Sequence, residues 1–379
     1  MSNSAALKES LRKDIEKRGG IPFADFMAQC LYHPEYGYYI VPRDRIGKEG
    51  DFFTSSSVHA LFGRLVSRQL VQMADLLGGE TFQVVEQGAG EGHLALDILD
   101  ALAEEAPQLY ERLNYIIVEV SPDNRARQAL QLAAHAARVT WCDEGRWQID
   151  SGCFLSNELV DAFPVHVVEK HDGQIKEVFV VNTASGFAEE LRPSADAINR
   201  HITWLGKGPV EGNRAEVNLV APVWMHEVAS RINKGFVMTI DYGYPAEELY
   251  APHRRSGTLM CYHRHQADEN PYELVGDKDL TAHVDFTALQ KSGSEAGLET
   301  LWFGEQYRFL LGLGFFEELV KMEAAATDEH EARALRLTLK NLIMPEAGMG
   351  ETFKVLVQGK DVDSPQLLCS RPVSAIPFV

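Results

Sequence analysis

Cysteine is scarce in this chain of 379 residues, which has five thiols at scattered positions and no C-x-x-C pair. A disulfide framework and a zinc ribbon both need paired or clustered cysteines, so neither is expected. Long apolar runs are missing too, and none approaches the roughly 18 residues of a membrane span, so no membrane insertion is expected. The first residues lack the apolar segment of a signal peptide. Together these absences favour a cytoplasmic protein.

Basic residues are few relative to acidic ones: 36 Lys and Arg stand against 55 Asp and Glu, a formal net charge of −19. Such an excess repels phosphate, so nucleic acid is not an expected partner, whereas a basic polypeptide is compatible with it. No G-x-S-x-G elbow and no P-loop occur, so hydrolase and kinase functions lack their main residues. His263 and His265 stand beside Cys261 without a further ligand at suitable spacing, so no metal site is expected.

The sequence does contain enough apolar material for a large core, since 45% of its residues are hydrophobic. Short apolar strands alternate with helices after residue 80, which is the pattern of a parallel sheet covered on both faces. The expected fold class is therefore α/β, with a Rossmann-like, mostly parallel sheet, an antiparallel edge strand, a helical N-terminal region and long insertions.

Three consecutive segments are predicted: a helical region over 1–79, a sheet over 80–245 with an insertion at about 182–217, and a third segment over 246–379. The third segment is expected to hold a substrate-covering loop, helices and a final edge strand, because the stretch 245–285 has little periodicity. Strands are predicted at 82–86, 115–120, 138–141, 153–156, 165–170, 175–181, 236–241 and 353–358.

The most informative stretch is VVEQGAGEGH, residues 84–93. A strand ends at Glu86, and Gly88, Gly90 and Gly92 then follow at two-residue spacing before a helix begins. Glycines at such a turn let backbone N–H groups approach a ligand at the carboxyl edge of the sheet. A second strand carries another acid, Glu119, near its end. This context predicts a nucleoside-binding site, although a glycine turn alone would also fit a tight turn without a ligand.

The chemistry of these residues distinguishes between possible nucleosides. A dinucleotide fingerprint would place a third glycine where this chain has His93, and the Glu86 carboxylate would oppose a pyrophosphate. S-adenosylmethionine (SAM) carries an ammonium and a sulfonium and no phosphate, so it suits an acidic site. Glu119 would then accept hydrogen bonds from the ribose hydroxyls. One alternative is that both acids are only neighbours of helix N-termini, and a more distant one is a dehydrogenase.

The chain as a whole resembles the MidA-like family of SAM-dependent methyltransferases, from about residue 20 to residue 358. The motifs that carry the resemblance are GDFFTS (50–55), VVEQGAGEG (84–92), VEVSP (118–122), FLSNELVDAFPVH (154–166), IDYGYP (240–245), DLTAHVDF (279–286) and MGETFKVL (349–356). The sequence departs from the family at Ser56-Ser57, where Pro-Glu is frequent, and at Glu91, where Arg is frequent.

This resemblance implies a class I methyltransferase sheet with SAM as cofactor. Mitochondrial members of the family act as arginine methyltransferases in complex I assembly, which implies N-methylation of a protein arginine and a respiratory-complex subunit as a candidate acceptor. By the same resemblance, the loop Gly50–Ser55 covers the cofactor, with Asp51, Thr54 and Ser55 as contacts. The alternative for this loop is a turn followed by a helix N-cap.

Candidate acceptor residues follow the strand at 153–156. Glu158 and Asp161 are three residues apart, so they would share one face if the turn were helical. Two carboxylates could hold a guanidinium and accept its proton while geometry directs the attack. The alternative is that Asp161 caps a helix and Glu158 faces solvent.

Four further residues are candidates by position. Asp143 follows the strand at 138–141 and could reach the adenine amino group. Tyr242 and Tyr244 end a strong strand and could enclose a cationic acceptor, although core closure is the commoner role of such aromatics. His283 is a candidate proton acceptor, with a packed or capping histidine as the alternative.

The function predicted from the sequence is SAM-dependent methylation of a protein arginine. One alternative keeps SAM and replaces the protein by a small molecule with an oxygen or nitrogen nucleophile. Another is a non-catalytic assembly factor that binds SAM, against which the acceptor-site carboxylates Glu158 and Asp161 argue.

Overall fold

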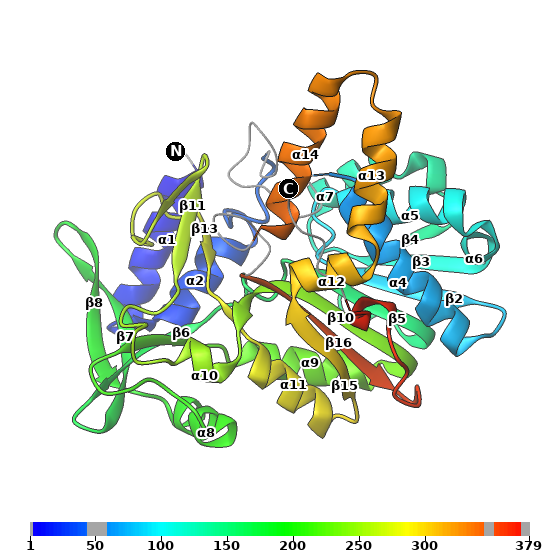
Figure 1. The fold of residues 1–379 in the computed structure, drawn as a ribbon. Helices are drawn as coiled ribbons and strands as arrows, with labels where there is room; N and C mark the ends of the chain where they lie inside the picture. The colour runs from blue at the N-terminus through cyan, green and yellow to red at the C-terminus, as the bar shows by residue number, and fades with distance from the viewer. Residues whose placement is uncertain (1–2, 44–58, 345–351, 373–379) are drawn as a thin grey trace. The chain divides into compact units, whose positions relative to one another are not determined.

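The computed structural model describes residues 3–43, 59–344 and 352–372 (Figure 1). The chain forms two compact units, each assembled from three stretches of sequence. Unit 1 comprises Met1–Phe52, Val160–Met225 and Gly243–Ser292, and unit 2 comprises Phe53–Leu159, His226–Tyr242 and Gly293–Val379. Because the stretches alternate along the chain, the units differ from the three consecutive segments expected from the sequence.

The largest sheet has eight strands: β2 (Phe82–Gln87), β3 (Leu113–Val118), β4 (Val139–Cys142), β5 (Ile149–Asn157), β10 (Ile232–Tyr244), β14 (Val284–Asp285), β15 (Glu299–Glu305) and β16 (Phe353–Lys360). Their order is β15-β16-β10-β5-β2-β3-β4, and β14 pairs with the end of β10. Neighbours from β10 to β4 are parallel, whereas β16 is antiparallel to both β10 and β15. The α/β class with a mostly parallel sheet is therefore confirmed.

The antiparallel strand β16 lies one position inside the sheet, and the prediction that it forms the edge was wrong. β15 pairs with its outer side, and seven of the eight residues of β16 are buried, as an internal strand requires. β15 itself was not predicted, because its register shifts between Thr300 and Trp302. Such a bulge breaks the two-residue alternation by which a half-buried strand is recognised in sequence.

Unit 2 surrounds its part of the sheet with helices (blue to cyan and orange in Figure 1). These are α4 (Leu61–Leu77), α5 (His93–Glu105), α6 (Pro107–Arg112), α7 (Pro122–Gln131), α12 (Gln306–Gly312), α13 (Phe315–Ala325) and α14 (Glu329–Ile343), with short 3₁₀ turns η1 (Ala133–His135) and η2 (Leu368–Ser370). α4 and α5 pack closely, since a Cβ added to Gly63 would lie 2.4 Å from the Asp97 Cβ. Apolar side chains of both helices join those of β2, β5 and β10 in one core.

Unit 1 contains a second, antiparallel sheet. Its strands are β1 (Ile21–Pro22), β6 (His166–His171), β7 (Gln174–Thr183), β8 (Gly186–Pro193) and β9 (Arg214–Val217), in the order β1-β7-β6-β9 with β8 against β7. The helices α1 (Asn3–Arg18) and α2 (Phe23–Tyr32) share a core with it. The strands predicted at 165–170 and 175–181 correspond to β6 and β7, which belong to this sheet and not to the mostly parallel one. They pair antiparallel because Asp172 and Gly173, both with positive φ, connect them too tightly for a crossover.

The sequence suggested a long loop over 245–285, but the structure has regular elements there. It contains α10 (Ala246–Leu249) and a three-stranded antiparallel sheet of β11 (Met260–His263), β12 (Gln266–Asp268) and β13 (Asp279–Thr281). His263 and His265 lie at the tight turn between β11 and β12. The remaining helices of the chain are α8 (Asp196–Leu205), α9 (Val220–Ser230) and α11 (Phe286–Glu295). Across the described ranges, no helix is both long enough and apolar enough to cross a membrane.

Candidate cofactor and acceptor sites

The glycine turn lies between β2 and α5 in unit 2. Gly88, Gly90 and Gly92 have φ values of 76°, 56° and 89°, a region that L-residues with side chains rarely adopt. A Cβ added to Gly88 would lie 2.8 Å from Leu159 Cδ1, so a side chain there would also collide with a neighbouring segment. The Gly92 N–H donates to the Ala89 carbonyl at 2.8 Å and closes the turn. The backbone is thereby bare at the carboxyl end of β2.

Glu86, on β2, is 2% exposed and accepts a 2.7 Å hydrogen bond from the Tyr115 hydroxyl of β3. Burial raises the pKa of Glu86 to about 7, and the tyrosine hydrogen bond acts in the opposite direction. The carboxyl group therefore titrates near neutrality. A cation beside it would favour the ionised form, and a phosphate would disfavour it. This is the electrostatic preference that the sequence predicted for the site.

Glu119 follows β3 and is 6% exposed. One of its oxygens accepts the Ser121 N–H at 2.8 Å, and the other accepts the side-chain amides of Asn124 at 3.3 Å and Gln128 at 3.2 Å. Burial raises the pKa of Glu119, and these three donors lower it. A carboxylate has about four acceptor positions, so a bond to a second ribose hydroxyl would displace one of the longer amide contacts.

Asp143 follows β4 and is held by Arg125, whose Nη2 donates to Asp143 Oδ1 at 2.8 Å. Arg125 also donates to the Glu119 carbonyl at 2.7 Å and to the Cys142 carbonyl at 2.9 Å, so it joins the ends of β3 and β4. The Asp143 side chain is 58% exposed, and the adenine contact predicted for it stays a prediction. Next to Glu119, Val120 exposes 56% of its surface and offers an apolar face that an adenine ring could cover.

The chemistry of this edge fits SAM. Two buried carboxyl groups, Glu86 and Glu119, stand at the ends of adjacent parallel strands on either side of a bare glycine turn. Ammonium and ribose hydroxyl groups match carboxylates, whereas a pyrophosphate would face like charge. Asp51, Thr54 and Ser55, predicted to contact the cofactor, lie outside the described residues.

Glu158 begins the connection that follows β5. It has a φ of 52°, which is uncommon for a residue with a side chain and is frequent at functional positions. Its N–H donates to the Ile240 carbonyl at 2.9 Å, and Asn157 Nδ2 donates to its Oε1 at 3.1 Å. The fully buried Asp241 accepts the next N–H, that of Leu159, at 3.2 Å. The backbone around Glu158 is thus fixed at the end of the sheet.

The turn that contains Glu158 and Asp161 is not helical, so the argument that helical spacing puts both carboxylates on one face does not apply. Asp161 belongs to unit 1, where it is 5% exposed and its carbonyl accepts the Ala282 N–H at 3.0 Å. Burial raises the pKa of the Tyr262 phenol, and the charge of Asp161 contributes to the same shift. Asp161 is therefore a buried acid near the Tyr262 phenol, in a turn that is not helical.

The two predicted aromatic residues have different surroundings. In unit 2, the Tyr242 ring packs edge-on against Phe353 at 5.4 Å between centroids, as in the core-closure alternative. In unit 1, the Tyr244 ring lies 5.4 Å from the His283 ring and carries the Arg254 guanidinium over its face at 4.2 Å. The chain's own arginine therefore covers the surface of Tyr244 that was predicted to receive a cationic acceptor.

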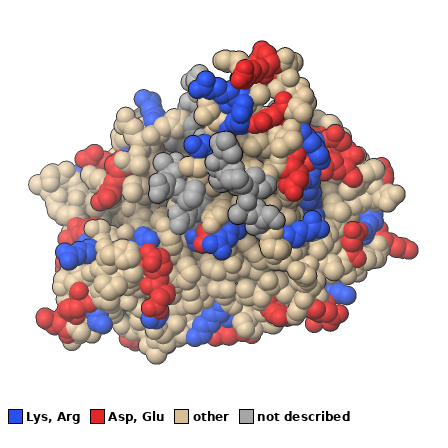
Figure 2. All heavy atoms as spheres, in the orientation of Figure 1, with Lys and Arg blue, Asp and Glu red and all other residues tan. Residues whose placement is uncertain are grey.

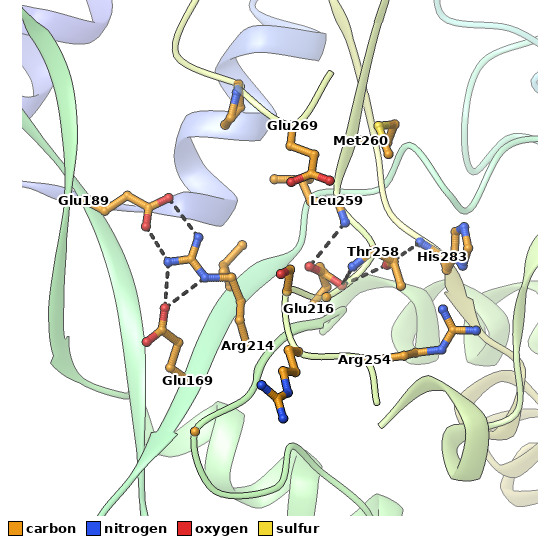
Figure 3. Close-up of a pocket in the computed structure, with 16 residues that line it drawn as sticks. Glu169, Glu189, Arg214, Glu216, Arg254, Thr258, Leu259, Met260, Glu269 and His283 are labelled. Atoms are coloured by element: carbon orange, nitrogen blue, oxygen red, sulfur yellow. Dashed lines mark hydrogen bonds and ion pairs between the residues drawn. The ribbon is translucent and has the colours of Figure 1, made fainter. Parts of the chain in front are cut away.

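His283 also lines a pocket of about 530 Å³ in unit 1 (Figure 3). One wall is an ion-pair cluster in which Arg214 bridges Glu169 at 2.7 Å and Glu189. Two residues further along β9, the buried Glu216 accepts the N–H and the hydroxyl of Thr258, each at 2.8 Å. The dashed lines of Figure 3 mark both sets of contacts: Arg214 pairs with the two glutamates, and Glu216 accepts hydrogen bonds from Thr258 and Leu259. The wall geometry thus keeps the loop that holds Thr258 in place.

That loop depends on Gly257. A Cβ on this residue, whose φ is 77°, would lie 2.1 Å from the Glu216 carboxylate. The Thr258 hydroxyl in turn accepts the His283 N–H at 3.0 Å, so Glu216 fixes the backbone of His283 through one intermediate. The proton-acceptor role predicted for the His283 ring stays a prediction.

Sequence reasoning missed several residues that shape these sites. Tyr115 had a signal, because parallel pairing of Val84 with Tyr115 puts it on the same face as Glu86, two residues further along β2. Asp241 was visible as a strand-end acid, but its bond to the Leu159 N–H depends on long-range geometry. Gln128 gave no signal, since a glutamine within a helix is usually a surface residue.

Comparisons with known proteins agree with this chemistry. The sequence matches a family described as S-adenosyl-L-methionine-dependent methyltransferase over residues 65–304. Relatives include the mitochondrial protein arginine methyltransferase NDUFAF7 homolog of Drosophila melanogaster, 29% identical over 94% of this chain and 85% of that protein. The human mitochondrial protein arginine methyltransferase NDUFAF7 is 28% identical over 89% of this chain and 80% of its own length.

A solved structure is also similar. A Burkholderia thailandensis protein, crystallised with bound S-adenosyl-homocysteine, has a TM-score of 0.88 and 33% sequence identity. The likeness covers 99% of this chain and 97% of that one. The bound molecule is what remains of SAM after its methyl group has been transferred.

Proposed function

Because this chain belongs to the S-adenosyl-L-methionine-dependent methyltransferase family, we propose that its methyl acceptor is an arginine side chain of a partner protein. SAM is the cofactor, and it supplies a methyl group activated by the sulfonium charge. The observation that carries the cofactor site is the pair of buried carboxyl groups, Glu86 and Glu119, at the ends of adjacent strands around the glycine turn. The names of the relatives as protein arginine methyltransferases support the choice of acceptor.

In this proposal, each residue has a separate task. Glu86 pairs with the ammonium group of the cofactor, Glu119 holds the ribose, and the turn from Gly88 to Gly92 admits the amino-acid part close to the backbone. Glu158 orients the acceptor guanidinium through hydrogen bonds and receives the proton that its nitrogen releases. The fixed backbone of Glu158 and the Asn157 amide that donates to its Oε1 at 3.1 Å support this role, because together they hold the carboxylate at the end of the sheet.

The acceptor is tested with methyl-labelled SAM, the purified full chain and a lysate of cells that lack the gene. We expect label in protein, recovered as methylarginine by mass spectrometry of the labelled band. A subunit of a respiratory complex is the candidate that the resemblance implies, so the membrane and soluble fractions are analysed separately. We also propose that the protein acts in the cytoplasm, as its sequence leads us to expect. Label that appears only in small molecules would favour a small-molecule acceptor instead.

The role of Glu158 is tested with Glu158→Gln. We expect methyl transfer to fall by about 100-fold or more, because general-base and orienting groups contribute on this order, while calorimetry finds SAM affinity unchanged. Glu80→Gln is the control, since Glu80 is an exposed carboxylate on a loop of the same unit. Equal transfer rates for Glu158→Gln and the wild type would remove Glu158 from the mechanism.

A further inference from the structure

Gln128, on α7, connects three parts of the cofactor-binding edge. Its side chain is fully buried. Its Nε2 donates to the Gly90 carbonyl at 2.7 Å and to Glu119 at 3.2 Å, and its Oε1 accepts the Trp141 indole N–H at 2.9 Å. These partners belong to the turn after β2, the end of β3 and strand β4. One carboxamide thus uses both of its N–H groups and its oxygen on three separate segments.

Packing reinforces these hydrogen bonds. A Cβ added to Gly92 would lie 3.3 Å from Gln128 Cγ, so the end of the glycine turn rests against the stem of the same side chain. Through its bond to the Gly90 carbonyl, the same side chain also holds the middle of the turn. Gln128 of α7 therefore fixes the conformation of the turn, and it also fixes the position of the turn relative to Glu119.

We propose that Gln128 is a positioning residue for the cofactor, which sets the glycine turn and the Glu119 carboxylate at a fixed separation. This inference rests on the proposed cofactor site. The turn receives the amino-acid part of SAM and Glu119 receives the ribose, so a ligand that spans both gains affinity when their spacing is set before it binds. Trp141 holds the carboxamide so that its amide group, and not its oxygen, points toward Gly90 and Glu119.

The first test is the SAM dissociation constant of Gln128→Leu, measured by calorimetry on the full chain. Loss of a hydrogen bond to a carboxylate and of one to a buried carbonyl predicts binding about 10- to 100-fold weaker. The matched control is Gln69→Leu. Gln69 is likewise fully buried in unit 2, and it bonds Gln72 and the Cys369 N–H, away from the glycine turn. We expect Gln69→Leu to lower thermal stability and to leave SAM affinity within twofold of the wild type.

The isosteric Gln128→Glu provides a readout that a purely structural role would not move. Near pH 8 the new carboxylate faces Glu119 and cannot donate to Gly90, so SAM affinity is expected to fall as in Gln128→Leu. Near pH 6 a shared proton restores one donor, and the ratio of variant to wild-type dissociation constants is expected to shrink severalfold.

Three results would overturn the role of Gln128. One is wild-type affinity in Gln128→Leu, provided that Glu119→Ala has lost affinity and so confirms that SAM binds at this edge. Another is an equal loss of affinity in Gln69→Leu, which would mean general destabilisation. The third is a pH-independent ratio for Gln128→Glu. If the wild type binds SAM and Glu119→Ala binds it with the same affinity, the proposed cofactor site is overturned, and the role of Gln128 with it.

Discussion

At the residue scale, the Glu86 carboxyl group accepts a hydrogen bond of 2.7 Å from the Tyr115 hydroxyl of the neighbouring strand. Burial raises the pKa of Glu86 to about 7, and this hydrogen bond keeps it from rising further. The charge available to attract an ammonium group near neutral pH therefore depends on one phenol. A single oxygen atom on β3 controls the protonation of an acid on β2.

Replacement of Tyr115 by Phe tests this dependence. Without the hydroxyl, the pKa of Glu86 rises above its present value, so less of the group is ionised at pH 7. We expect SAM binding at that pH to weaken by about tenfold, and the pH at which affinity is gained to move upward. Calorimetric titrations across a pH series measure both effects. Tyr110→Phe is the control, because its hydroxyl bonds His135 elsewhere in unit 2, and a profile shared by Tyr115→Phe and the wild type would contradict the argument.

At the residue scale, the sequence identified those site groups whose chemistry is local. The glycine spacing and the strand-end acids Glu86 and Glu119 follow from a strand, a turn and a helix in immediate succession. Gln128 could not be found in this way, since its partners lie 38, 9 and 13 residues away along the chain. Arg254, which covers the Tyr244 ring, is missed for the same reason. Their positions depend on packing between elements.

At the scale of elements, the close approach of β2, β5 and β10 depends on glycine. A Cβ added to Gly152 on β5 would lie 1.9 Å from the Gln83 carbonyl oxygen, and one added to Gly235 on β10 would lie 2.0 Å from the Gly152 carbonyl oxygen. These strands pair in register at Gly152, so a side chain there would force them apart. The carboxyl ends of β2 and β5 lead to Glu86 and Glu158, so this close contact helps to set the distance between the proposed cofactor and acceptor sites.

Gly152→Ala is therefore expected to lower the free energy of unfolding by about 3 kcal/mol or more, because backbone atoms cannot yield as a flexible side chain does. Urea denaturation measures this loss. Gly79→Ala is the comparison: Gly79 has a φ of 89° with no atom within 4 Å of an added Cβ, so only backbone strain of about 1 kcal/mol applies. Similar losses in the two variants would show that conformation, and not strand spacing, makes Gly152 necessary.

Elements were predictable where periodicity and termination agreed. The helix expected directly after the glycine turn is α5, because apolar spacing and a preceding glycine both mark it. β15 and the hairpins of unit 1 were misjudged, since a bulge hides the first and the parallel or antiparallel pairing of the others depends on connection length. The sequence therefore indicated most strands but not the sheet to which each belongs.

For the molecule as a whole, buried acids dominate the titration. Among the described residues, burial raises the pKa of Glu86, Asp97 and Asp285 to about 7. Burial also raises the pKa of Glu119 and Glu216. Ion pairs lower the pKa of others, such as Glu318 beside Lys321 and Arg68. Acidic and basic side chains are interspersed on the face seen in Figure 2, although the total charge is −19.

These shifts predict maximal stability near pH 5. A raised pKa means that the folded state binds protons more tightly, so this stability is present below about pH 4.5 and is lost as pH rises through about 7; for Glu86 alone the loss is about 3 kcal/mol. Groups with a lowered pKa, such as Glu318 and the buried His201, whose pKa burial lowers to about 4, lose their contribution as pH falls from the unfolded value through the folded one. Denaturation from pH 4 to 9 measures the curve, and Glu86→Gln should flatten its alkaline side. Stability that rises between pH 5 and 8 would contradict this balance.

The inner position of β16 affects how the chain can fold as it is made. β10 and β15 precede β16 in the chain, yet both pair with it. While Phe353–Lys360 is still within the ribosome, a nascent chain therefore carries two strands with open edges and an apolar gap between them. The sheet can close only once β16 has been made, so the facing edges of β10 and β15 stay unpaired until synthesis has passed that strand.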